Sequence, residues 1–189
     1  MKKILLSAAL VASMGAVALT PSAARAADGT ITINGQITSA TCTISINGGT
    51  SSPTVTLPTV QSNQFSASGT ATGWTAINIA LTNCAAGSGT PAVTKVLPYF
   101  ELGANTDPGN GYLKNATGTA TGVEVALSTT NALSGKLNLA LNAGQQGAGT
   151  PALISGNPTF TYYAAYVSNA ASVTAGTVGT SVQYDLNYQ

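Results

Sequence analysis

The stretch GTVGTSVQYDLNYQ, Gly176 to Gln189, stands at the end of the sequence and decides the fold that we expect. Apolar and polar residues alternate along it, which predicts a long β-strand with one apolar face. No further strand-like run follows, so we expect the sheet position beside this strand to lack a partner from the same chain. The apolar face consists of Val178, Val182, Tyr184, Leu186 and Tyr188, with Thr180 between them.

A second informative stretch is ADGTITINGQITSATC, Ala27 to Cys42, where isoleucines alternate with threonine and asparagine. This pattern also predicts an extended segment with one apolar face. Asn34-Gly35 interrupts it, and Asn-Gly is a strong signal for a two-residue hairpin turn. One interpretation therefore pairs Thr30–Ile33 with Gln36–Ser39 of the same chain. In the other, the apolar face packs against a different molecule.

Residues 1–26 have the features of a secretory signal peptide. Two lysines precede an apolar run over residues 4–19, and Ala24-Arg25-Ala26 offers a small-x-small cleavage site. The run is shorter than the roughly 20 apolar residues that a membrane-spanning helix needs. We therefore expect the chain to be exported and the mature protein to begin at Ala27.

The expected mature chain carries very little charge. Without residues 1–26, the 189-residue sequence keeps three lysines against five carboxylates, a net charge of −2, and it contains no histidine. The 163 residues that remain are suited to one domain. Because no basic patch is available to neutralise phosphates, the composition argues against binding to nucleic acids or to anionic membranes.

Cys42 and Cys84 are the two cysteines of the sequence. In an exported chain we expect them to form one intramolecular disulfide, and two buried free thiols are the alternative. A disulfide that closes a loop of this length stabilises a fold by roughly 3–4 kcal/mol.

The remainder of the sequence consists of short alternating runs separated by turns rich in glycine, proline and asparagine. Many short strands with such turns are typical of an all-β sandwich or barrel. Pro98 interrupts one run, which predicts a sheet edge or a bulge there. The expected strands are 41–46, 54–57, 76–84, 95–102, 123–127, 137–141, 159–167 and 176–188.

The sequence gives little support for catalysis or metal binding. Without histidine there is no Ser-His or Cys-His nucleophile pair. Glu101 and Asp107 are the closest carboxylates that could act together, and two solvated surface acids are the simpler interpretation. No spacing matches a zinc or calcium site. Trp74 and the seven tyrosines could line a sugar-binding face, although such residues more often fill a sandwich core.

These stretches together resemble the major pilin subunits of chaperone–usher (type 1-like) fimbriae of Gram-negative bacteria. Thr30–Cys42 is similar to the pilin N-terminal extension that runs into the first cysteine strand, and Ile77–Cys84 to the second cysteine strand. Phe160–Ser168 resembles the penultimate strand. The final run has the family's glycine fourteen residues from the terminus, here Gly176, and its penultimate tyrosine, here Tyr188.

The resemblance implies an incomplete immunoglobulin-like β-sandwich that lacks its last strand and is completed by donor-strand exchange. Residues 1–26 would be the signal peptide, 27–34 the donor-strand extension, and 35–189 the pilin domain. The implied function is a structural subunit of a fimbrial shaft that supports adhesion or biofilm formation. A minor adaptor subunit and a secreted, monomeric carbohydrate-binding sandwich are the alternatives.

The resemblance also assigns roles to residues. The implied partners are further copies of the chain in a head-to-tail filament, a periplasmic chaperone and an outer-membrane usher, with no cofactor, nucleic acid or small-molecule substrate. The location that the resemblance implies is a fimbria on the cell surface, which the chain reaches by export through the periplasm. The donor residues would be Ala27, Gly29, Ile31, Ile33 and Gly35, with Gly29 at a shallow part of the groove. The acceptor groove and chaperone-binding strand would comprise Gly176, Val178, Thr180, Val182, Tyr184, Leu186 and Tyr188.

Overall fold

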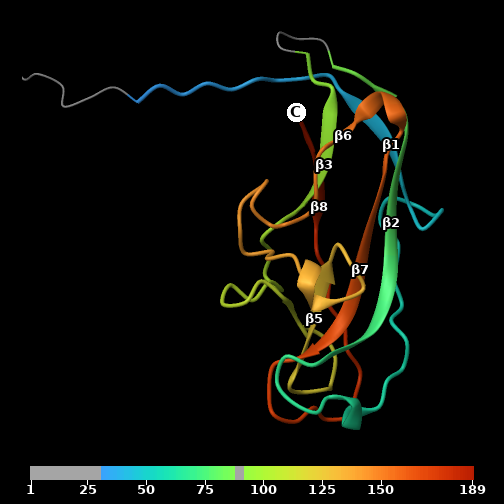
Figure 1. Cartoon of the computed structure of the whole chain (residues 1–189), viewed down its shortest axis with the longest axis vertical. Helices are drawn as coiled ribbons and strands as arrows, with labels where there is room; N and C mark the ends of the chain where they lie inside the picture. Colours follow the sequence, from blue (N-terminus) through green and yellow to red (C-terminus); the bar gives the residue numbers. More distant parts are fainter. Residues whose placement is uncertain (1–30, 88–91) are drawn as a thin grey trace, which may run out of the picture. The chain divides into compact units, whose positions relative to one another are not determined.

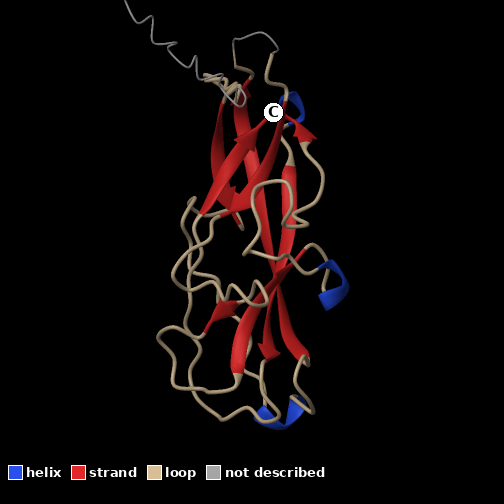
Figure 2. Cartoon of the chain, turned by 90° about the vertical axis from the view of Figure 1, so that its left-hand side faces the viewer, coloured by secondary structure: helices blue, strands red, loops and turns tan. Residues whose placement is uncertain are grey.

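The computed structural model describes residues 31–87 and 92–189. The chain divides into two compact units, Met1–Gly35 and Gln36–Gln189. The expected signal peptide, Ala27 and Gly29 lie outside the described residues. Residues 31–35 form neither helix nor strand, so the hairpin pairing of Thr30–Ile33 is not present in the described part of the chain. The second unit is built from β-strands and three short 3₁₀ turns (Figures 1 and 2).

The larger sheet has five strands, and each strand runs antiparallel to its neighbours. Its two long strands, β2 and β7, lie side by side through the domain (Figure 1). In spatial order the strands are β1 (Thr41–Ile46), β2 (Ala71–Ala85), β7 (Thr159–Ser168), β5 (Val123–Ser128) and β4 (Leu113–Lys114).

The smaller sheet has three strands, with the last strand of the chain at one edge. In spatial order they are β6 (Ala152–Leu153), β3 (Lys95–Phe100) and β8 (Tyr184–Tyr188). The 3₁₀ turns are η1 (Ser62–Gln64), η2 (Leu133–Gly135) and η3 (Ile154–Gly156).

One apolar core joins the two sheets. Phe100 of β3 meets Tyr162 of β7 edge to face, with ring centroids 5.0 Å apart, an arrangement that aromatic quadrupoles favour. Ile79 and Leu81 of β2 and Leu127 of β5 belong to the same buried cluster. The prediction of an all-β sandwich is therefore confirmed.

The long ladder between β2 and β7 follows from sequence and contains one bulge. β-branched and aromatic side chains suit a pleated, half-buried surface, and Ile77 of β2 lies opposite Tyr162 of β7. The register shifts between Thr72 and Thr75, where Gly73 has a φ of +76°. A Cβ atom on Gly73 would lie 3.0 Å from the Tyr166 ring, so glycine is needed for both conformation and space.

The two cysteines form a disulfide that joins β1 to β2. Cys42 and Cys84 are bonded, and no free cysteine remains in the described part of the chain. The predicted disulfide is confirmed, and the alternative of two free thiols is wrong.

β3 lies between β6 and β8, but β6 pairs only with Lys95 and Val96, so the rest of β3 lacks a neighbouring strand on that side. The backbone N–H groups of Lys95 and Glu101 donate to the carbonyls that flank β8, at Gln189 and Gln183. The backbone groups of the residues between them, including Pro98, therefore point to the opposite side of β3. On that side β6 ends at the level of Val96. Proline has no N–H to leave unpaired there, in agreement with the predicted edge.

Beyond Pro98, the Gln146 side chain takes the place of a neighbouring strand. Its Nε2 donates to the carbonyl of Phe100, and its Oε1 accepts from the Phe100 N–H at 3.1 Å. The buried amide of Gln146 thus satisfies backbone groups that a longer β6 would otherwise bond.

The strand predicted over residues 137–141 is wrong. Leu137 and Leu139 are buried, as their alternation suggested. Their backbone hydrogen bonds, however, go to different segments: the N–H of Leu137 to Leu127, that of Asn138 to Gln146, and that of Leu139 to Gly111. Alternating burial without a continuous neighbour gives an extended segment but no ladder.

Candidate functional site: an open apolar groove

Two further runs that the sequence predicts as strands are unpaired over all or most of their length. Residues 54–57 belong to no sheet, and the predicted strand 176–188 is a strand only over Tyr184–Tyr188. Both predictions are therefore corrected at the level of secondary structure. The alternating burial nevertheless remains, because Val55 and Leu57 are half-buried while Thr54 and Thr56 are exposed.

Residues 176–183 are bonded along one side only. The carbonyls of Thr177 and Gly179 accept hydrogen bonds from the backbone of residues 116–120. The backbone groups of Val178, Thr180 and Val182 make no hydrogen bond to any other residue that the structure describes. Since alternate residues of an extended chain direct their N–H and C=O groups to opposite sides, these three residues present an open edge.

The segment 54–57 presents a second open edge. Its backbone makes no hydrogen bond within the described ranges, in contrast to the bonded turn that precedes it at Ile46 and Thr50. An unpaired edge is a template for another strand.

An apolar groove of about 810 Å³ runs between these two segments and reaches the core. Its walls include Val55 and Leu57 on one side and Val178 and Val182 on the other. Its floor is formed by core residues of both sheets, namely Ile46, Ile77, Ile79, Phe100, Leu113, Val125, Leu127, Ala164 and Tyr166. The sandwich is therefore open along one side.

The Tyr184 side chain spans the two walls. Its hydroxyl donates a hydrogen bond of 2.8 Å to the carbonyl of Ser51. Desolvation by burial raises the pKa of this phenol above its ordinary value, so the hydroxyl keeps the proton that it donates.

The groove contains only part of the predicted acceptor set. Val178, Thr180, Val182 and Tyr184 line it, whereas Gly176, Leu186 and Tyr188 do not. Leu186 packs against the main core, as Val178, Val182 and Tyr184 also do. A Cβ atom on Gly176 would lie 2.5 Å from the backbone nitrogen of Ala120, so this glycine allows a close approach of two segments.

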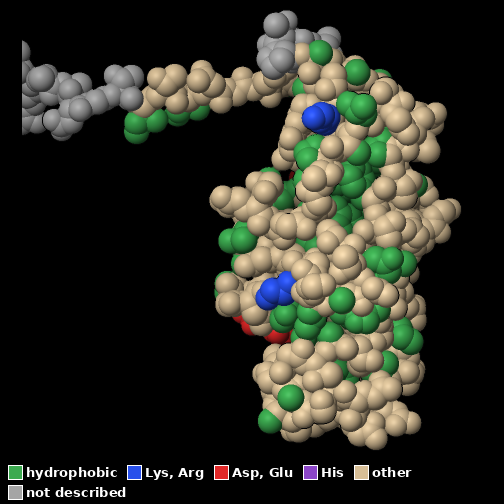
Figure 3. All heavy atoms as spheres, in the orientation of Figure 1, with side chains coloured by type: hydrophobic (Ala, Val, Ile, Leu, Met, Phe, Trp, Pro, Cys, Tyr) green, Lys and Arg blue, Asp and Glu red, His purple; other side chains and the backbone are tan. Residues whose placement is uncertain are grey.

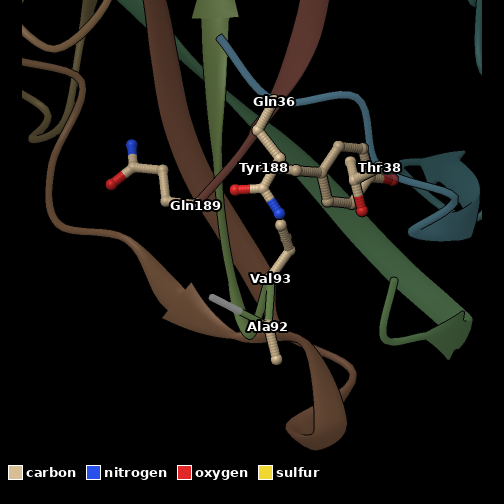
Figure 4. Close-up of a pocket in the computed structure, with 6 residues that line it drawn as sticks. All are labelled: Gln36, Thr38, Ala92, Val93, Tyr188 and Gln189. Carbon is tan, nitrogen blue, oxygen red and sulfur yellow. The ribbon is translucent and has the colours of Figure 1, made fainter. Parts of the chain in front are cut away.

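Tyr188 contributes to a separate small cavity. The cavity measures about 100 Å³, and Figure 4 shows its six lining residues. Gln36 and Thr38 are among them, so these two residues contact their own domain. The complete lining is Gln36, Thr38, Ala92, Val93, Tyr188 and Gln189.

The described part of the predicted donor segment has exposed apolar side chains. Ile31 is 90% exposed and Ile33 is 89% exposed. Ile37, which sequence analysis did not single out, is 97% exposed. It has the same parity as Ile31 and Ile33, and this spacing is the signal that would have identified it. A Cβ atom on Gly35 would contact nothing within 4 Å.

The carboxylates are arranged differently from the pair considered in the sequence. Glu101 lies beside Asp185, whose hydrogen bond and charge raise the pKa of Glu101. Asp107 lies beside Glu124, where burial is the main cause of the raised pKa of Glu124. No group of three or more potential metal ligands occurs within residues 31–87 and 92–189.

Few charged groups are visible on the face drawn in Figure 3, in keeping with the low charge of the sequence. Within residues 31–87 and 92–189, no helix is long and apolar enough to span a membrane. Fold and site therefore define a class of protein: a disulfide-linked β-sandwich whose core remains accessible through a groove between two unpaired edges.

Comparisons with known proteins identify the family. Residues 31–189 match the family described as fimbrial protein. The chain is 38% identical over 182 residues to the major fimbrial subunit SMF-1 of Stenotrophomonas maltophilia, covering 91% of this chain and 99% of that protein. It is 36% identical over 176 residues to the F17 fimbrial protein of Escherichia coli, covering 91% and 93%. The chain belongs to the fimbrial protein family.

Two solved structures are also similar. The P pilus rod subunit PapA matches with a TM-score of 0.49 and 17% identity, covering 85% of this chain and all of that one. An antigen and type I fimbria protein of Burkholderia pseudomallei matches with a TM-score of 0.49 and 25% identity, covering 80% and 97%.

Membership of this family makes the chain a structural subunit of surface fimbriae and not an enzyme. The predicted class, function and location are thereby confirmed. Its partners include other fimbrial subunits, because the function of such a subunit is to polymerise.

Proposed function

We propose that this chain is the repeating subunit of a fimbrial shaft and that each copy completes the sandwich of the next by donor-strand exchange. In this proposal residues 27–34 of one copy enter the groove of its neighbour. A periplasmic chaperone occupies the groove before assembly, and an outer-membrane usher is the site of exchange. Residues 1–26 act as the signal peptide and are removed on export.

The observation that carries the proposal is the match between the groove and the N-terminal segment. The groove has an open backbone edge on each side and an apolar floor. The segment has alternating isoleucines that are exposed in the single chain. Insertion of an extended segment satisfies backbone groups and buries side chains at alternate positions.

Burial of the two isoleucines contributes about 1.5–3 kcal/mol each. Completing the fold of the acceptor adds the ladder hydrogen bonds along both edges, and slow unfolding of the completed sandwich makes the joint kinetically stable. Because donor and acceptor surfaces differ, the contact is head-to-tail and propagates into a filament.

The experiment changes the inward and outward residues of the donor separately. The chain carrying both Ile31→Thr and Ile33→Thr is expressed with its chaperone and usher, and filaments are counted by electron microscopy. We expect few or no filaments, because two threonines bury far less apolar surface. The matched control Thr32→Ser changes the outward face and should assemble normally. Normal filaments from the double isoleucine variant, or from a chain that lacks residues 27–34, would contradict the donor assignment.

A further inference from the structure

Asn115 lies in a loop beside the final run, and its side chain uses its full hydrogen-bonding capacity. Its Nδ2 donates to the carbonyls of Ala120 and Thr177, at 2.8 and 3.2 Å. Its Oδ1 accepts from the backbone N–H groups of Gly118 and Gly179, at 3.0 and 2.9 Å. A primary amide offers two donor hydrogens and two acceptor lone pairs, so each of them has a partner. Two of these bonds close the loop, and the other two cross to the final run.

The two crossing bonds are placed around Val178. They engage the carbonyl of the residue before Val178 and the N–H of the residue after it. A neighbouring strand would bond these same groups on this side of an extended chain. Residues 115–120 form neither helix nor strand, so the amide side chain of Asn115 takes the place of a strand residue. The backbone groups of Val178 itself belong to the opposite side, which is the open edge of the groove.

The other bonds between the loop and the run depend on the same loop conformation. The carbonyl of Gly179 accepts from two loop N–H groups, at 2.8 and 3.1 Å, and that of Thr177 accepts from the Ala120 N–H at 3.0 Å. A Cβ atom on Gly118 would overlap the Thr177 carbonyl, so loop and run are in close contact. Because the Asn115 amide also fixes the shape of the loop, its loss should weaken these backbone bonds as well.

A second asparagine fastens the next part of the run. The Asn105 Nδ2 donates to the carbonyl of Ser181 at 3.1 Å and to its hydroxyl at 3.0 Å. Ser181 has the same parity as residues 177 and 179, so all three are held on the side of the run that faces away from the open edge. Asparagine side chains therefore fasten one side of a run whose other side is unpaired.

We propose that Asn115 is a positioning residue for subunit assembly, which holds residues 177–179 extended while the groove is empty, with Asn105 as a second brace at Ser181. This inference rests on the proposed donor-strand exchange, in which the incoming strand bonds the open edge of the run. An edge that is already extended need not be ordered when the strand arrives, so less conformational entropy is lost on insertion. Without the brace, the wall of the groove is formed for only part of the time, and uptake of a strand falls by that fraction.

The test measures amide hydrogen exchange in the monomeric mature chain by NMR spectroscopy. Asn115→Leu keeps the volume of the side chain and removes its hydrogen bonds. The reporting group is the Thr177 N–H, because its partner, the Thr119 hydroxyl at 3.0 Å, is unaltered in the variant. We expect this N–H to exchange roughly tenfold faster, since the bonds that hold the run to the loop are lost. Unchanged exchange at Thr177 would overturn the inference, because packing by a side chain of that size would then suffice.

Tyr162→Phe is the matched control for a general loss of stability. It removes the hydrogen bond from Tyr162 to the carbonyl of Ala148, within the paired region. We expect faster exchange in β7 and no change at Thr177, because the run detaches by local opening and not by unfolding of the sandwich. If the two variants change both regions alike, Asn115 contributes only to overall stability and the inference is wrong. Should Asn115→Leu not fold, Asn115→Ala is measured at the same N–H, and the same results decide.

Uptake of a strand links this local effect to assembly. The monomeric mature chain is mixed with a fluorescent peptide that has the sequence of residues 27–34, and binding is followed by fluorescence anisotropy. We expect Asn115→Leu to take up the peptide at least about twofold more slowly than the unaltered chain, in proportion to the lost fraction of extended edge. Tyr162→Phe should take it up at the unaltered rate.

Failure of this inference can be distinguished from failure of the proposed function. If chains that lack residues 27–34 polymerise, donor-strand exchange itself is wrong, whatever the exchange at Thr177 shows. If they do not polymerise and Asn115→Leu takes up the peptide at the unaltered rate, only the role of Asn115 in assembly is wrong.

Discussion

Strand β7 and the final run of residues 176–188 have nearly the same sequence pattern but different structures. Each places apolar side chains at alternate positions, among them Phe160, Tyr162 and Tyr166 in β7, although β7 also has apolar residues between these positions. β7 is a strand throughout, because β2 and β5 bond it on both sides. The final run is a strand only over Tyr184–Tyr188, where it pairs with β3. Alternation therefore specifies an extended segment with an apolar face, whereas a ladder also requires a neighbour.

For a fimbrial subunit this difference is functional. The missing neighbour of residues 176–183 is the strand that we propose a second copy supplies. The paired region should accordingly determine the stability of the single subunit, and the unpaired region should determine assembly. The predictions below separate these two properties, beginning with the largest expected effect.

The largest effect is expected for a charge in the groove wall. Val182→Asp places a carboxylate where the proposed donor would exclude water, and an unpaired buried charge is very unfavourable. We expect no filaments by electron microscopy, although the free subunit should tolerate the change because its groove is open. Ala175→Asp puts the same charge on an exposed residue just before the same run, outside the groove lining, and should assemble normally. Equal behaviour of the two variants would contradict the division into inward and outward residues.

The disulfide should have the next largest effect, on the stability of the subunit. Replacing Cys42 and Cys84 by serine removes the bond that joins β1 to β2. We expect a loss of about 3–4 kcal/mol in the free energy of unfolding, measured in urea on the monomeric mature chain. Reduction of the unaltered chain under the same conditions is the control. A loss below about 1 kcal/mol would show that the disulfide does not constrain the unfolded chain as the loop-closure account requires.

Two tyrosines compare the paired and unpaired regions directly. The Tyr162 hydroxyl, on β7, donates to the buried carbonyl of Ala148 at 2.9 Å. Tyr162→Phe leaves that carbonyl without its partner and should cost about 1–3 kcal/mol. Tyr184→Phe removes the bond to exposed Ser51, which water can replace, and should cost less than about 1 kcal/mol. Urea unfolding of both variants measures the two losses in the free energy of unfolding. A larger loss for Tyr184→Phe than for Tyr162→Phe would contradict the comparison of the paired and unpaired regions.

The smallest effect is a pH dependence within the paired region. Glu124 of β5 is 3% exposed, and its Oε2 accepts a hydrogen bond of 2.8 Å from the Asn110 side chain. Burial, together with neighbouring Asp107, raises the pKa of Glu124. The protonated Glu124 side chain therefore stabilises the fold fully in acid, below the ordinary pKa of glutamate. This stabilisation is lost as the pH rises through the raised pKa of Glu124 in the folded chain.

Glu124→Gln imitates the protonated carboxyl and should remove this part of the pH dependence. We expect the variant to unfold at a higher temperature than the unaltered chain at neutral pH and at a similar temperature in acid. Gln61→Glu makes the reverse exchange of amide and carboxylate at an exposed residue and is the control. A variant that is less stable at neutral pH would contradict the sign.

Sequence reasoning was most accurate where local pattern and tertiary neighbours agree. The bounds of β1 match the expected 41–46, and β5 and β7 match to within one residue. β2 begins five residues earlier than expected, at Ala71, because a bulge at Gly73 allows pairing to continue past a glycine. The two-residue strands β4 and β6 are too short to have a recognisable period.

The sequence predicted one wall of the groove, as the apolar face of a strand, but not the groove itself. The alternation of the final run identified Val178, Thr180, Val182 and Tyr184, which do line the groove. The opposite wall at residues 54–57 looked like an ordinary strand, and nothing local indicated that it would lack a neighbour. The partners of Glu101 and Glu124 could not be predicted either, because each pair brings together residues from different parts of the chain.

The most direct test of the central claim is a high-resolution electron cryomicroscopy map of the native filament. The account predicts an extended segment between residues 54–57 and 176–183 of each subunit, bonded to both edges. That segment should be the N-terminal extension of the adjacent copy, with Ile31 and Ile33 facing the core. A groove that is empty, or that is filled by a segment of the same chain, would contradict the account.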